Sequence, residues 1–392
     1  MITELIVNKA HCSGCGACYS SCPAEAIAMQ PDEKGFAYPS VDDSKCISCG
    51  LCVKICESIG NKQITMQKAY AAFAKDGEIR KSSSSGGVFS LLAEKVLSKG
   101  GAVFGAAFNK DFGVEHICVE NEEHLNLLRG SKYVQSNLRD TFREAKSRLE
   151  NAQPILFSGV PCQIAGLKAY LRKEYDNLYL VELVCHGAPS PRIWEKYVEL
   201  MSKKGEPKRI SFRMKDSSWR RFATLFLYKN NVAYLCEHRY DPFMKGFLSN
   251  LYLRPSCYFC RLKHNNRAGD ITLGDFWGAE RYVPEIDDDK GLSLVFVNTE
   301  RGKRLLNSIL DKTTYKNLDE DVNALASMLN HSVDLNPKSE KFYRDFFANQ
   351  EQLIQIIEKY TKPNVKTRCK SAIRTVLDKL GLLDIARKMM KK

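Results

Sequence analysis

The amino-acid sequence predicts a protein of mixed α+β / α/β class, with a small cysteine-rich N-terminal domain, a mixed α/β core and a helical C-terminal tail. Two copies of one cysteine motif occupy residues 12–56. Strand and helix patterns alternate over residues 88–201, as in domains whose helices pack on a sheet. After about residue 300 the apolar residues recur mostly at helical spacing. With 392 residues, the chain is long enough to bury a substantial core beyond its cysteine-rich part.

The N-terminal cysteines follow the spacing C-x2-C-x2-C-x3-C twice, and the two runs are offset by 34 residues at every position. Three thiolates of such a run converge on one iron–sulfur cluster, while the fourth opens the next helix and binds the other cluster. Zinc sites use two pairs of ligands instead, and disulfides need an oxidising compartment. We therefore predict a two-cluster 4Fe–4S ferredoxin-type domain over residues 1–67. The predicted ligand sets are Cys12, Cys15, Cys18 and Cys56 for one cluster, and Cys46, Cys49, Cys52 and Cys22 for the other.

The following elements are predicted from hydrophobic spacing and from glycine and proline breaks. The ferredoxin-type domain closes with a short strand at 64–66, and a linker leads to a serine–glycine cluster at 82–87. Helices are expected over 88–97, 139–149, 162–171 and 191–201, and strands over 102–108, 114–119, 154–158, 178–184, 271–273 and 292–297. Region 208–236 has period-two segments and is predicted to be a local antiparallel insert. These elements form a core over residues 68–335, followed by a helical, basic extension over 336–392.

The composition indicates a cytoplasmic protein. No apolar run approaches the roughly 20 residues that span a bilayer, and the N-terminus lacks the basic and apolar pattern of an export signal. The 15 cysteines of such a chain point to metal ligation in a reducing cytoplasm.

The net charge of +13 is concentrated near the C-terminus, because residues 363–392 hold nine Lys or Arg against two acidic residues. The apolar residues of this stretch recur at helical spacing, at Ile373, Val376, Leu377, Leu380 and Leu383. Such a basic amphipathic helix can dock on an anionic membrane surface or an acidic partner, or it can pack on the core with its basic face in solvent. Nucleic-acid binding is not expected, because the charge lies in one terminal stretch without a recognised binding motif.

Four further cysteines stand in suggestive positions. Cys162 and Cys185 each follow a predicted strand, and Cys257 and Cys260 form a C-x2-C pair, so the four could hold a third 4Fe–4S cluster. Three alternatives remain open at this point. The C-x2-C pair could bind zinc together with Cys236 and His238, Cys162 could be a reactive thiol near His186, and any of the four could be a small buried hydrophobe.

Three segments have the composition of a flavin or nucleotide site. Ser84, Ser85, Gly86 and Gly87 open a predicted helix, whose free N–H groups can receive a phosphate or a pyrimidine carbonyl. Lys132 and Tyr133 join a cation and an aromatic ring after a glycine turn, and residues 271–278 place a carboxylate and two aromatic rings after a strand. Taken alone, the serine–glycine cluster is more commonly a flexible linker whose last serine caps a helix, and a Gly-Ser-Lys sequence is more often an ordinary turn. Residues 271–278 could equally be a turn with buried aromatic rings.

Taken in order, the motifs S-S-G-G (84–87), G-S-K-Y (130–133), G-V-P-C-Q (159–163), C-H-G (185–187), C-x2-C (257–260) and L-G-D-F-W-G (273–278) resemble those of one family. Over roughly residues 1–335 the chain resembles the coenzyme F(420) hydrogenase/dehydrogenase beta-subunit family, in its bacterial type with an N-terminal two-cluster ferredoxin domain. The resemblance implies an FAD-binding α/β core with its own 4Fe–4S cluster, held by Cys162, Cys185, Cys257 and Cys260. It also implies that the flavin contacts the serine–glycine helix start, Lys132 with Tyr133, and the loop before Cys162 at Ser158, Gly159 and Pro161.

The function expected from these features is that of an iron–sulfur flavoprotein oxidoreductase. FAD would exchange electrons with a reduced hydride-donor cofactor or a small-molecule acceptor, and the 4Fe–4S clusters would exchange single electrons with a redox partner protein or small electron carrier. The alternative is a ferredoxin-type electron-transfer adaptor without a flavin. Nothing in the sequence spells out a site for a particular hydride carrier.

Overall fold

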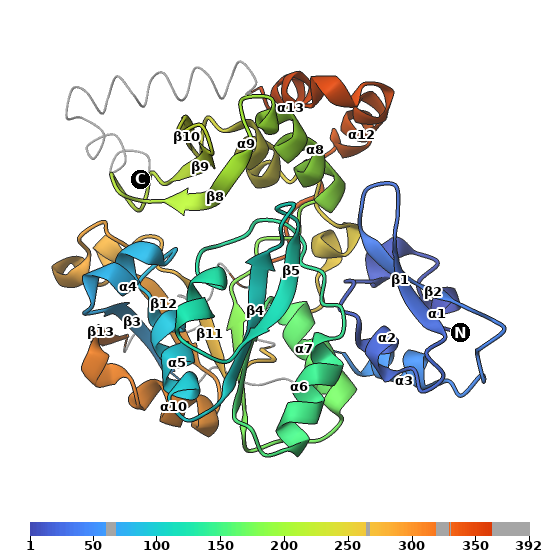
Figure 1. The fold of residues 1–392 in the computed structure, drawn as a ribbon, viewed down its shortest axis with the longest axis horizontal. Coiled ribbons are helices and arrows are strands. Elements are labelled where there is room, and N and C mark those ends of the chain that lie inside the picture. The colour runs from blue at the N-terminus through green and yellow to red at the C-terminus, as the bar shows by residue number, and fades with distance from the viewer. Residues whose placement is uncertain (60–67, 264–266, 319–328, 330, 363–392) are drawn as a thin grey trace, which may run out of the picture.

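The computed structural model describes residues 1–59, 68–263, 267–318, 329 and 331–362. These residues form three parts that lie against one another in Figure 1. The head comprises the elements up to residue 59, and the core is built around one large sheet. The cap combines an inserted antiparallel sheet with helices from two separate stretches of the chain.

The head repeats its motif in the backbone as well as in the sequence. Gly16 and Gly50, each with φ of 71°, precede the two cluster-motif helices. Gly14 (φ 70°) and Ser48 (φ 52°) correspond across the same 34-residue offset. Positive φ favours residues with little or no side chain, so the small residues of the motif let both loops turn tightly. The elements of the head are α1 (Ile2–Leu5), α2 (Ala17–Ser21), β1 (Ile27–Pro31), β2 (Ala37–Val41) and α3 (Leu51–Ser58).

The core contains an eight-stranded mixed sheet in the order β13-β3-β12-β11-β7-β6-β4-β5. The four central strands β4, β6, β7 and β11 are parallel to one another. The strands on either side of these four pair in the antiparallel direction. The strands are β3 (Lys68–Ala74), β4 (Ala102–Phe108), β5 (Val114–Val119), β6 (Ile155–Gly159), β7 (Leu178–Leu183), β11 (Ile271–Asp275), β12 (Ser293–Val297) and β13 (Thr313–Leu318). The parallel centre directs the carboxyl ends of β6, β7 and β11 to one edge, where α/β proteins bind their ligands.

Helices cover both faces of this sheet. On one face, α5 and α10 pack against alternate residues such as Val103, Leu156 and Val295. On the other face, α6 and α7 pack against Phe104 and Phe157. Figure 1 shows the head beside α6 and α7, away from α5 and α10. The helices of the core are α4 (Gly77–Ser82), α5 (Val88–Leu97), α6 (Thr141–Glu150), α7 (Pro161–Leu171) and α10 (Glu300–Asn307).

The cap lies above the sheet in Figure 1 and has a hydrophobic core of its own. Trp194, Phe212, Phe243 and Tyr252 are fully buried in this cluster. Phe342 and its neighbours on the helices 339–348 and 353–361 join it, so these two helices are part of the packed protein. The elements of the cap are α8 (Pro191–Ser202), β8 (Pro207–Met214), β9 (Ala223–Tyr228), β10 (Ala233–Glu237), α9 (Pro242–Leu248), α12 (Ser339–Ala348) and α13 (Leu353–Thr361).

Most elements expected from the sequence are present within a few residues, including the antiparallel insert, which is the three-stranded sheet β10-β9-β8. The predicted linker after residue 67 is wrong, because residues 68–74 form β3 in the interior of the large sheet. The mostly helical pattern predicted after residue 300 also missed β13, an edge strand. The strand predicted at 64–66 and the amphipathic tail helix at 363–392 lie outside the described residues.

No helix in the described part of the chain combines the length and the apolar character required to cross a membrane.

Candidate functional site

A cavity of about 1180 Å³ lies where the head, the core and the cap meet. This volume exceeds the roughly 300–1000 Å³ of a typical site for one small ligand. The segments that follow β6, β7 and β11 all contribute to its wall, through Cys162 at the start of α7, Cys185 and Trp277. The topology therefore places the site at the carboxyl edge of the parallel strands.

Four head cysteines, Cys12, Cys15, Cys18 and Cys56, line this cavity together. Burial raises the pKa of the Cys18 thiol, and the neighbouring thiols of Cys15, Cys12 and Cys56 raise it further. Burial likewise raises the pKa of Cys56 to about 11, with added effects from Cys15 and Cys12. The fourth cysteine of the second motif thus lies beside the first three of the first motif, as the two-cluster spacing predicts. The assignment of these residues as ligands stays a prediction.

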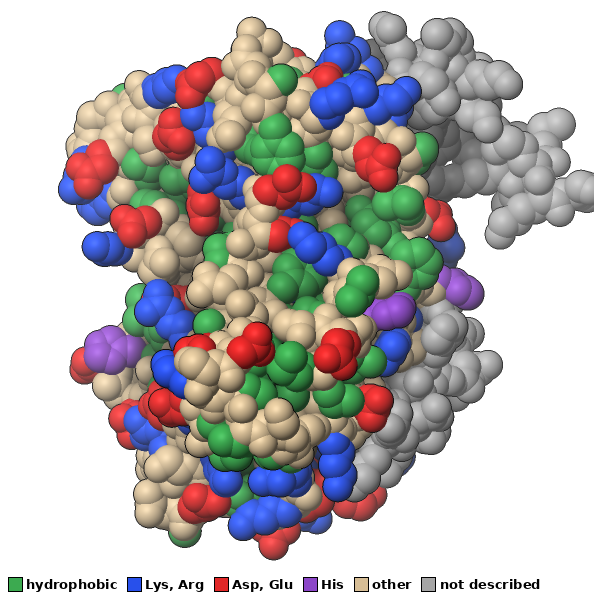
Figure 2. Space-filling view, turned by 90° about the vertical axis from the view of Figure 1, so that its right-hand side faces the viewer, with side chains coloured by type: hydrophobic (Ala, Val, Ile, Leu, Met, Phe, Trp, Pro, Cys, Tyr) green, Lys and Arg blue, Asp and Glu red, His purple; other side chains and the backbone are tan. Residues whose placement is uncertain are grey.

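The other predicted head ligands, Cys22, Cys46, Cys49 and Cys52, do not line the cavity. Cys22 and Cys52 pack against the small apolar core of the head, while Cys49 is exposed. Next to Cys49 lies Ile47, whose side chain is 66% exposed. Figure 2 faces the side of the molecule that carries the head, and there acidic and basic side chains alternate around small hydrophobic patches. This second cysteine set is therefore the one nearer to the outer surface.

The four core cysteines, which the sequence separates by up to 98 residues, come together at the cavity. Burial raises the pKa of Cys162, and the thiols of Cys185, Cys260 and Cys257 add to the effect. Burial also raises the pKa of Cys185 to about 12, again with contributions from Cys257 and Cys260. Cys15 of the head acts on Cys162 as well, so the core set adjoins the first head set. Four partly buried thiols at one wall match the donor set that a 4Fe–4S cluster requires, and their assignment as ligands stays a prediction.

The zinc alternative receives less support from the geometry. Cys236 lies on β10, and its thiol interacts with Tyr234 and the Glu237 carbonyl oxygen. His238 stacks on Phe222 and bonds to its carbonyl oxygen. Among the described residues, no three Cys, His, Asp or Glu side chains surround one point closely enough for a single metal ion. Each thiolate of a 4Fe–4S cluster binds a different iron, so such thiolates lie farther apart than the ligands of one ion.

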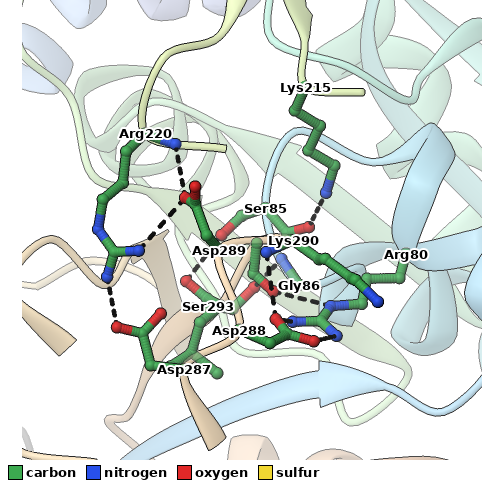
Figure 3. A network of polar contacts seen from close by, with 12 residues as sticks. Arg80, Ser85, Gly86, Lys215, Arg220, Asp287, Asp288, Asp289, Lys290 and Ser293 are labelled. Atoms are coloured by element: carbon green, nitrogen blue, oxygen red, sulfur yellow. Dashed lines mark hydrogen bonds and ion pairs between the residues drawn. The ribbon is translucent and has the colours of Figure 1, made fainter. Parts of the chain in front are cut away.

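The serine–glycine turn before α5 is fixed by contacts from three directions (Figure 3). Ser85 Oγ donates to the Leu292 carbonyl oxygen at 2.9 Å, and the Gly86 N–H donates to Ser293 Oγ at 3.0 Å. Lys215 Nζ donates to the Ser85 carbonyl oxygen at 2.6 Å. Gly87, with φ of 90°, precedes α5, and no side chain caps this helix. The turn is therefore held rigidly, with the uncapped N-terminus of α5 at the cavity wall.

The surrounding network holds the acidic loop 287–289 against the turn (Figure 3). Arg80 binds Asp288 through both terminal nitrogens, at 2.9 and 2.6 Å, and donates to the Gly291 carbonyl oxygen. Arg220 forms ion pairs with Asp287 and Asp289. These pairs join α4, the β8–β9 loop and the β11–β12 loop, so the charges of the acidic loop are largely balanced.

Lys132 lies in the loop after Gly130, beside the serine turn. Ser84 Oγ accepts a hydrogen bond from the Ser131 N–H at 2.6 Å, which ties the two segments together. Lys132 Nζ donates to the carbonyl oxygens of Leu127 and Arg129, and burial lowers its pKa to about 7. The Lys132 side chain therefore also stabilises the backbone of its own loop, a role that the sequence did not suggest.

The β6–α7 loop completes this side of the cavity. Ser158, Gly159 and Pro161 line it, and the Gln163 side chain accepts a hydrogen bond from the Val160 N–H at 3.0 Å. Eight of the nine residues predicted to contact a cofactor line the cavity, the exception being Gly86, which is buried against β12. An added Cβ at Gly86 would lie 2.4 Å from the Ala72 carbonyl oxygen, so this glycine permits a close backbone approach.

Two cations of the cavity region were missed in the sequence. Arg213 lines the cavity, pairs with Asp275 at 2.7 Å and donates to the Tyr133 hydroxyl at 3.0 Å. Its Nε is buried and lacks a hydrogen-bond partner among the described residues. Burial lowers the pKa of Lys215 to about 7, and the charges of Arg80 and Arg213 act in the same direction. Charged residues at the end of a period-two strand were the only sequence signal. Arg213 and Lys215 place positive charge beside the serine turn, which suits an anionic cofactor such as one with a pyrophosphate.

The cysteine-rich head on an α/β core defines an iron–sulfur electron-transfer protein. A family model for 4Fe–4S dicluster domains matches residues 11–58. The models for the coenzyme F(420) hydrogenase/dehydrogenase beta subunit match residues 69–142 with the N-terminal part and residues 152–321 with the C-terminal part. The chain therefore belongs to the coenzyme F(420) hydrogenase/dehydrogenase beta-subunit family, a family of oxidoreductases.

Known proteins that are similar to this chain are also named for coenzyme F(420) or as a ferredoxin. A coenzyme F(420)-dependent sulfite reductase of Methanocaldococcus jannaschii is 22% identical over 323 residues, which are 78% of this chain and 47% of that protein. The chain thus spans about half the length of this curated relative. An uncharacterized ferredoxin of the same organism is 38% identical over 56 residues, which are 14% of this chain and 71% of the ferredoxin. A chain of the F(420)-reducing NiFe hydrogenase complex of Methanosarcina barkeri superposes with a TM-score of 0.48 at 17% identity, covering 73% of this chain and 93% of that one.

Proposed function

We propose that the protein is a flavin-dependent iron–sulfur oxidoreductase, with FAD in the cavity and three 4Fe–4S clusters along one line. The observation that carries the proposal is the shared cavity: its wall contains the predicted flavin contacts, the four core cysteines and four head cysteines. Electron transfer between cofactors needs such proximity, and separate sites would not supply it. When bound, FAD exchanges electron pairs with a hydride carrier and single electrons with clusters.

Residues of the chain fit the two ends of such a cofactor. The uncapped start of α5, the partly buried Lys132 and the buried Arg213 and Lys215 can hold negative charge, because backbone N–H groups and cations both favour anions. Trp219 and Trp277 stack with their centroids 4.6 Å apart, and Trp277 lines the cavity. This aromatic wall suits a planar ring, such as that of the flavin or of a hydride carrier.

The positions of the cysteine sets give the proposed order of the cofactors, from the cavity to the outer end of the head. The core set adjoins Cys15 of the first head set, and Gly166 of α7 lies against the same cysteine. An added Cβ at Gly166 would be 2.9 Å from Cys15 Cβ, so the absence of a side chain allows this close approach. The second head set ends at the exposed Cys49 and Ile47. We therefore place the hydride carrier at the cavity and the one-electron partner at the outer end of the head.

The identity of the hydride carrier belongs to the proposal. The sulfite reductase relative is named as coenzyme F(420)-dependent, so a reduced deazaflavin is the first compound to test, followed by NADH and NADPH. The partner at the other end is a redox protein or a small electron carrier.

The deciding experiment is anaerobic purification followed by cofactor analysis. We expect about twelve irons per chain, from three clusters of about four irons each, and one FAD released on denaturation. Reduction of the bound flavin by one of the three hydride carriers would identify the substrate class. Iron without any flavin, under conditions that load flavin into other proteins, would instead support the non-flavin adaptor and refute the proposal.

A further inference from the structure

Arg254 is a core arginine that reaches from the segment before Cys257 into the head. Its guanidinium is among the most deeply buried large side chains, with 1% exposure. Nε donates to the Cys12 carbonyl oxygen at 2.8 Å, and one terminal nitrogen donates to the Ala37 carbonyl oxygen at 2.9 Å. The same nitrogen approaches Cys12 Sγ at 3.6 Å, which is within hydrogen-bond range for sulfur. Arg254 therefore touches a predicted ligand of the head cluster directly.

The head is shaped to admit this side chain. Gly14 lies in the first C-x2-C loop, and an added Cβ there would be 2.8 Å from a terminal nitrogen of Arg254. The guanidinium also stacks on the ring of Tyr38, with its central carbon 4.3 Å from the centroid. Gln135 completes the enclosure, because its side-chain oxygen accepts from Arg254 at 2.9 Å and its nitrogen donates to the Ser13 carbonyl oxygen.

No carboxylate in the described part of the chain balances the charge of Arg254. Other buried arginines have such a partner: Arg213 pairs with Asp275, and Arg267 pairs with Glu182 at 3.2 Å. Among the residues that the structure describes, no acidic side chain forms an ion pair with Arg254. A buried and unbalanced cation is costly, which favours another negative group beside it. A 4Fe–4S cluster with four thiolates is such a group, and its negative charge grows on reduction.

Arg254 also adjoins the core set. Its backbone carbonyl oxygen accepts a hydrogen bond from the Cys257 N–H at 2.9 Å. Hence Arg254 stands between the first head set and the core set, with its guanidinium against the head.

We propose that Arg254 is a positioning residue whose fixed positive charge raises the reduction potential of the cluster held by Cys12, Cys15, Cys18 and Cys56. This inference rests on the proposed function, since it requires that cluster. Hydrogen bonds to ligand sulfur and nearby positive charge both stabilise the reduced cluster. Arg254 thus makes the first head cluster the favoured acceptor for electrons that leave the core.

The test is a potentiometric titration of the full-length holoprotein, followed by electron paramagnetic resonance. Arg254→Gln removes the charge and keeps a hydrogen-bonding side chain. Arg254→Lys keeps the charge and loses the fork of donors. The matched control is Arg143→Gln, because Arg143 of α6 also donates to head carbonyl oxygens, those of Tyr19 and Ser20, but is paired with Asp140 and partly exposed.

We expect Arg254→Gln to make one head cluster at least tenfold harder to reduce, a shift of about 59 mV for a one-electron couple. The second head cluster, identified by the effect of Cys49→Ser on its signal, should keep its potential. Arg254→Lys should shift the first cluster by less than the Gln variant does, and Arg143→Gln should shift neither.

Three results would overturn the inference. Unchanged potentials in Arg254→Gln would show that the charge does not act on the cluster. Equal shifts in Arg254→Gln and Arg143→Gln would attribute the effect to a loosened interface, and loss of the cluster from both Arg254 variants would assign a purely structural role. A wild-type protein without cluster signals would refute the proposed function itself, which is a separate outcome.

Discussion

At the scale of single residues, Lys132 is the cation whose role is most open to experiment. Its ammonium group holds the carbonyl oxygens of its own loop and also lines the cavity. A positive charge there stabilises a reduced, anionic flavin. We predict that Lys132→Ala loses FAD or lowers the flavin potential while the iron content is unchanged. FAD release and flavin potentiometry measure this, with the exposed Lys99→Ala as a control.

The pH dependence sharpens this prediction. Because burial lowers the pKa of Lys132 to about 7, its charge is present below pH 7 and is lost as the pH rises. The difference in flavin potential between wild type and Lys132→Ala should therefore be largest below pH 7. An unchanged flavin content together with an unchanged potential at all pH values would show that Gly130–Tyr133 is an ordinary turn.

His116 is a second buried group with a predictable pH effect. Its ring bonds to Ser136 Oγ at 2.7 Å and to the Ser158 carbonyl oxygen at 3.0 Å, and burial lowers its pKa to about 4. The unfolded chain has an ordinary histidine pKa of about 6.5, so below that pH it binds more protons than the folded protein does. Stability from the neutral ring is therefore present above pH 6.5 and is lost as the pH falls towards 4, by up to about 1.4 kcal/mol per pH unit.

We predict that His116→Gln lowers the free energy of unfolding at pH 7.5 by about 1–3 kcal/mol, because a buried ring and its hydrogen bonds are lost. The variant should then lose less additional stability between pH 6.5 and 4.5 than the wild type does. Urea unfolding at several pH values measures both effects. His124→Gln, at an exposed position, serves as the control, and parallel pH profiles for His116→Gln and wild type would contradict the prediction.

Residues differ in how far the sequence revealed them. The head cysteines were predictable because their spacing is itself the geometric requirement of the clusters. Arg254 was not, since an arginine before a proline has no local pattern that announces a partner 242 positions away. Arg213 and Lys215 were missed for the same reason, because their environment comes from the packing of the cap on the core.

At the scale of elements, the short turn Pro255–Phe259 and the residue after it supply Cys257 and Cys260, two of the four proposed ligands of the core cluster. The turn brings Cys257 beside Cys185, and the Ala188 N–H donates to Cys257 Sγ at 3.3 Å. We predict that changing Cys257 and Cys260 together to Ser removes about four irons and leaves the head clusters intact. Iron analysis and electron paramagnetic resonance measure this.

The matched control for that change is Cys236→Ser, because this cysteine lies on β10 and does not line the cavity. It should leave the iron content unchanged. A wild-type protein that holds about eight irons, as two clusters would supply, and that also contains zinc would contradict the third cluster and restore the zinc alternative.

Among the elements, β3 shows why the sequence misled. Four of its seven residues are alanines, which have low strand propensity, so the sequence pattern does not indicate a strand there. The structure buries all four between neighbouring strands and helices. Small side chains are needed there because Gly86 packs against the Ala72 carbonyl oxygen. The strands β4 and β5, in contrast, matched their predicted bounds because their apolar runs are bordered by glycine turns.

At the scale of the whole molecule, the basic stretch 363–392 remains a separate question, since it lies outside the described residues. Its composition predicts docking on an anionic surface or packing on the core. We predict that deleting residues 363–392 leaves the iron and flavin contents intact. Binding to anionic vesicles that weakens with salt and is lost on deletion would support docking. An unfolded truncated protein would support packing.

The way the head sits on the rest of the protein has a consequence for kinetics. Ser190 Oγ donates to the Lys34 carbonyl oxygen, Gly35 abuts the backbone of Arg192, and Gly166 abuts Cys15, so contacts fix the head at several points. The motion of a mobile carrier domain between two docking sites becomes slower in viscous solvent, whereas a fixed domain makes no such motion. Electron transfer from the cavity to the head should accordingly proceed at the same rate in buffer and in concentrated glycerol, and solvent viscosity should slow only the encounter with the outside partner.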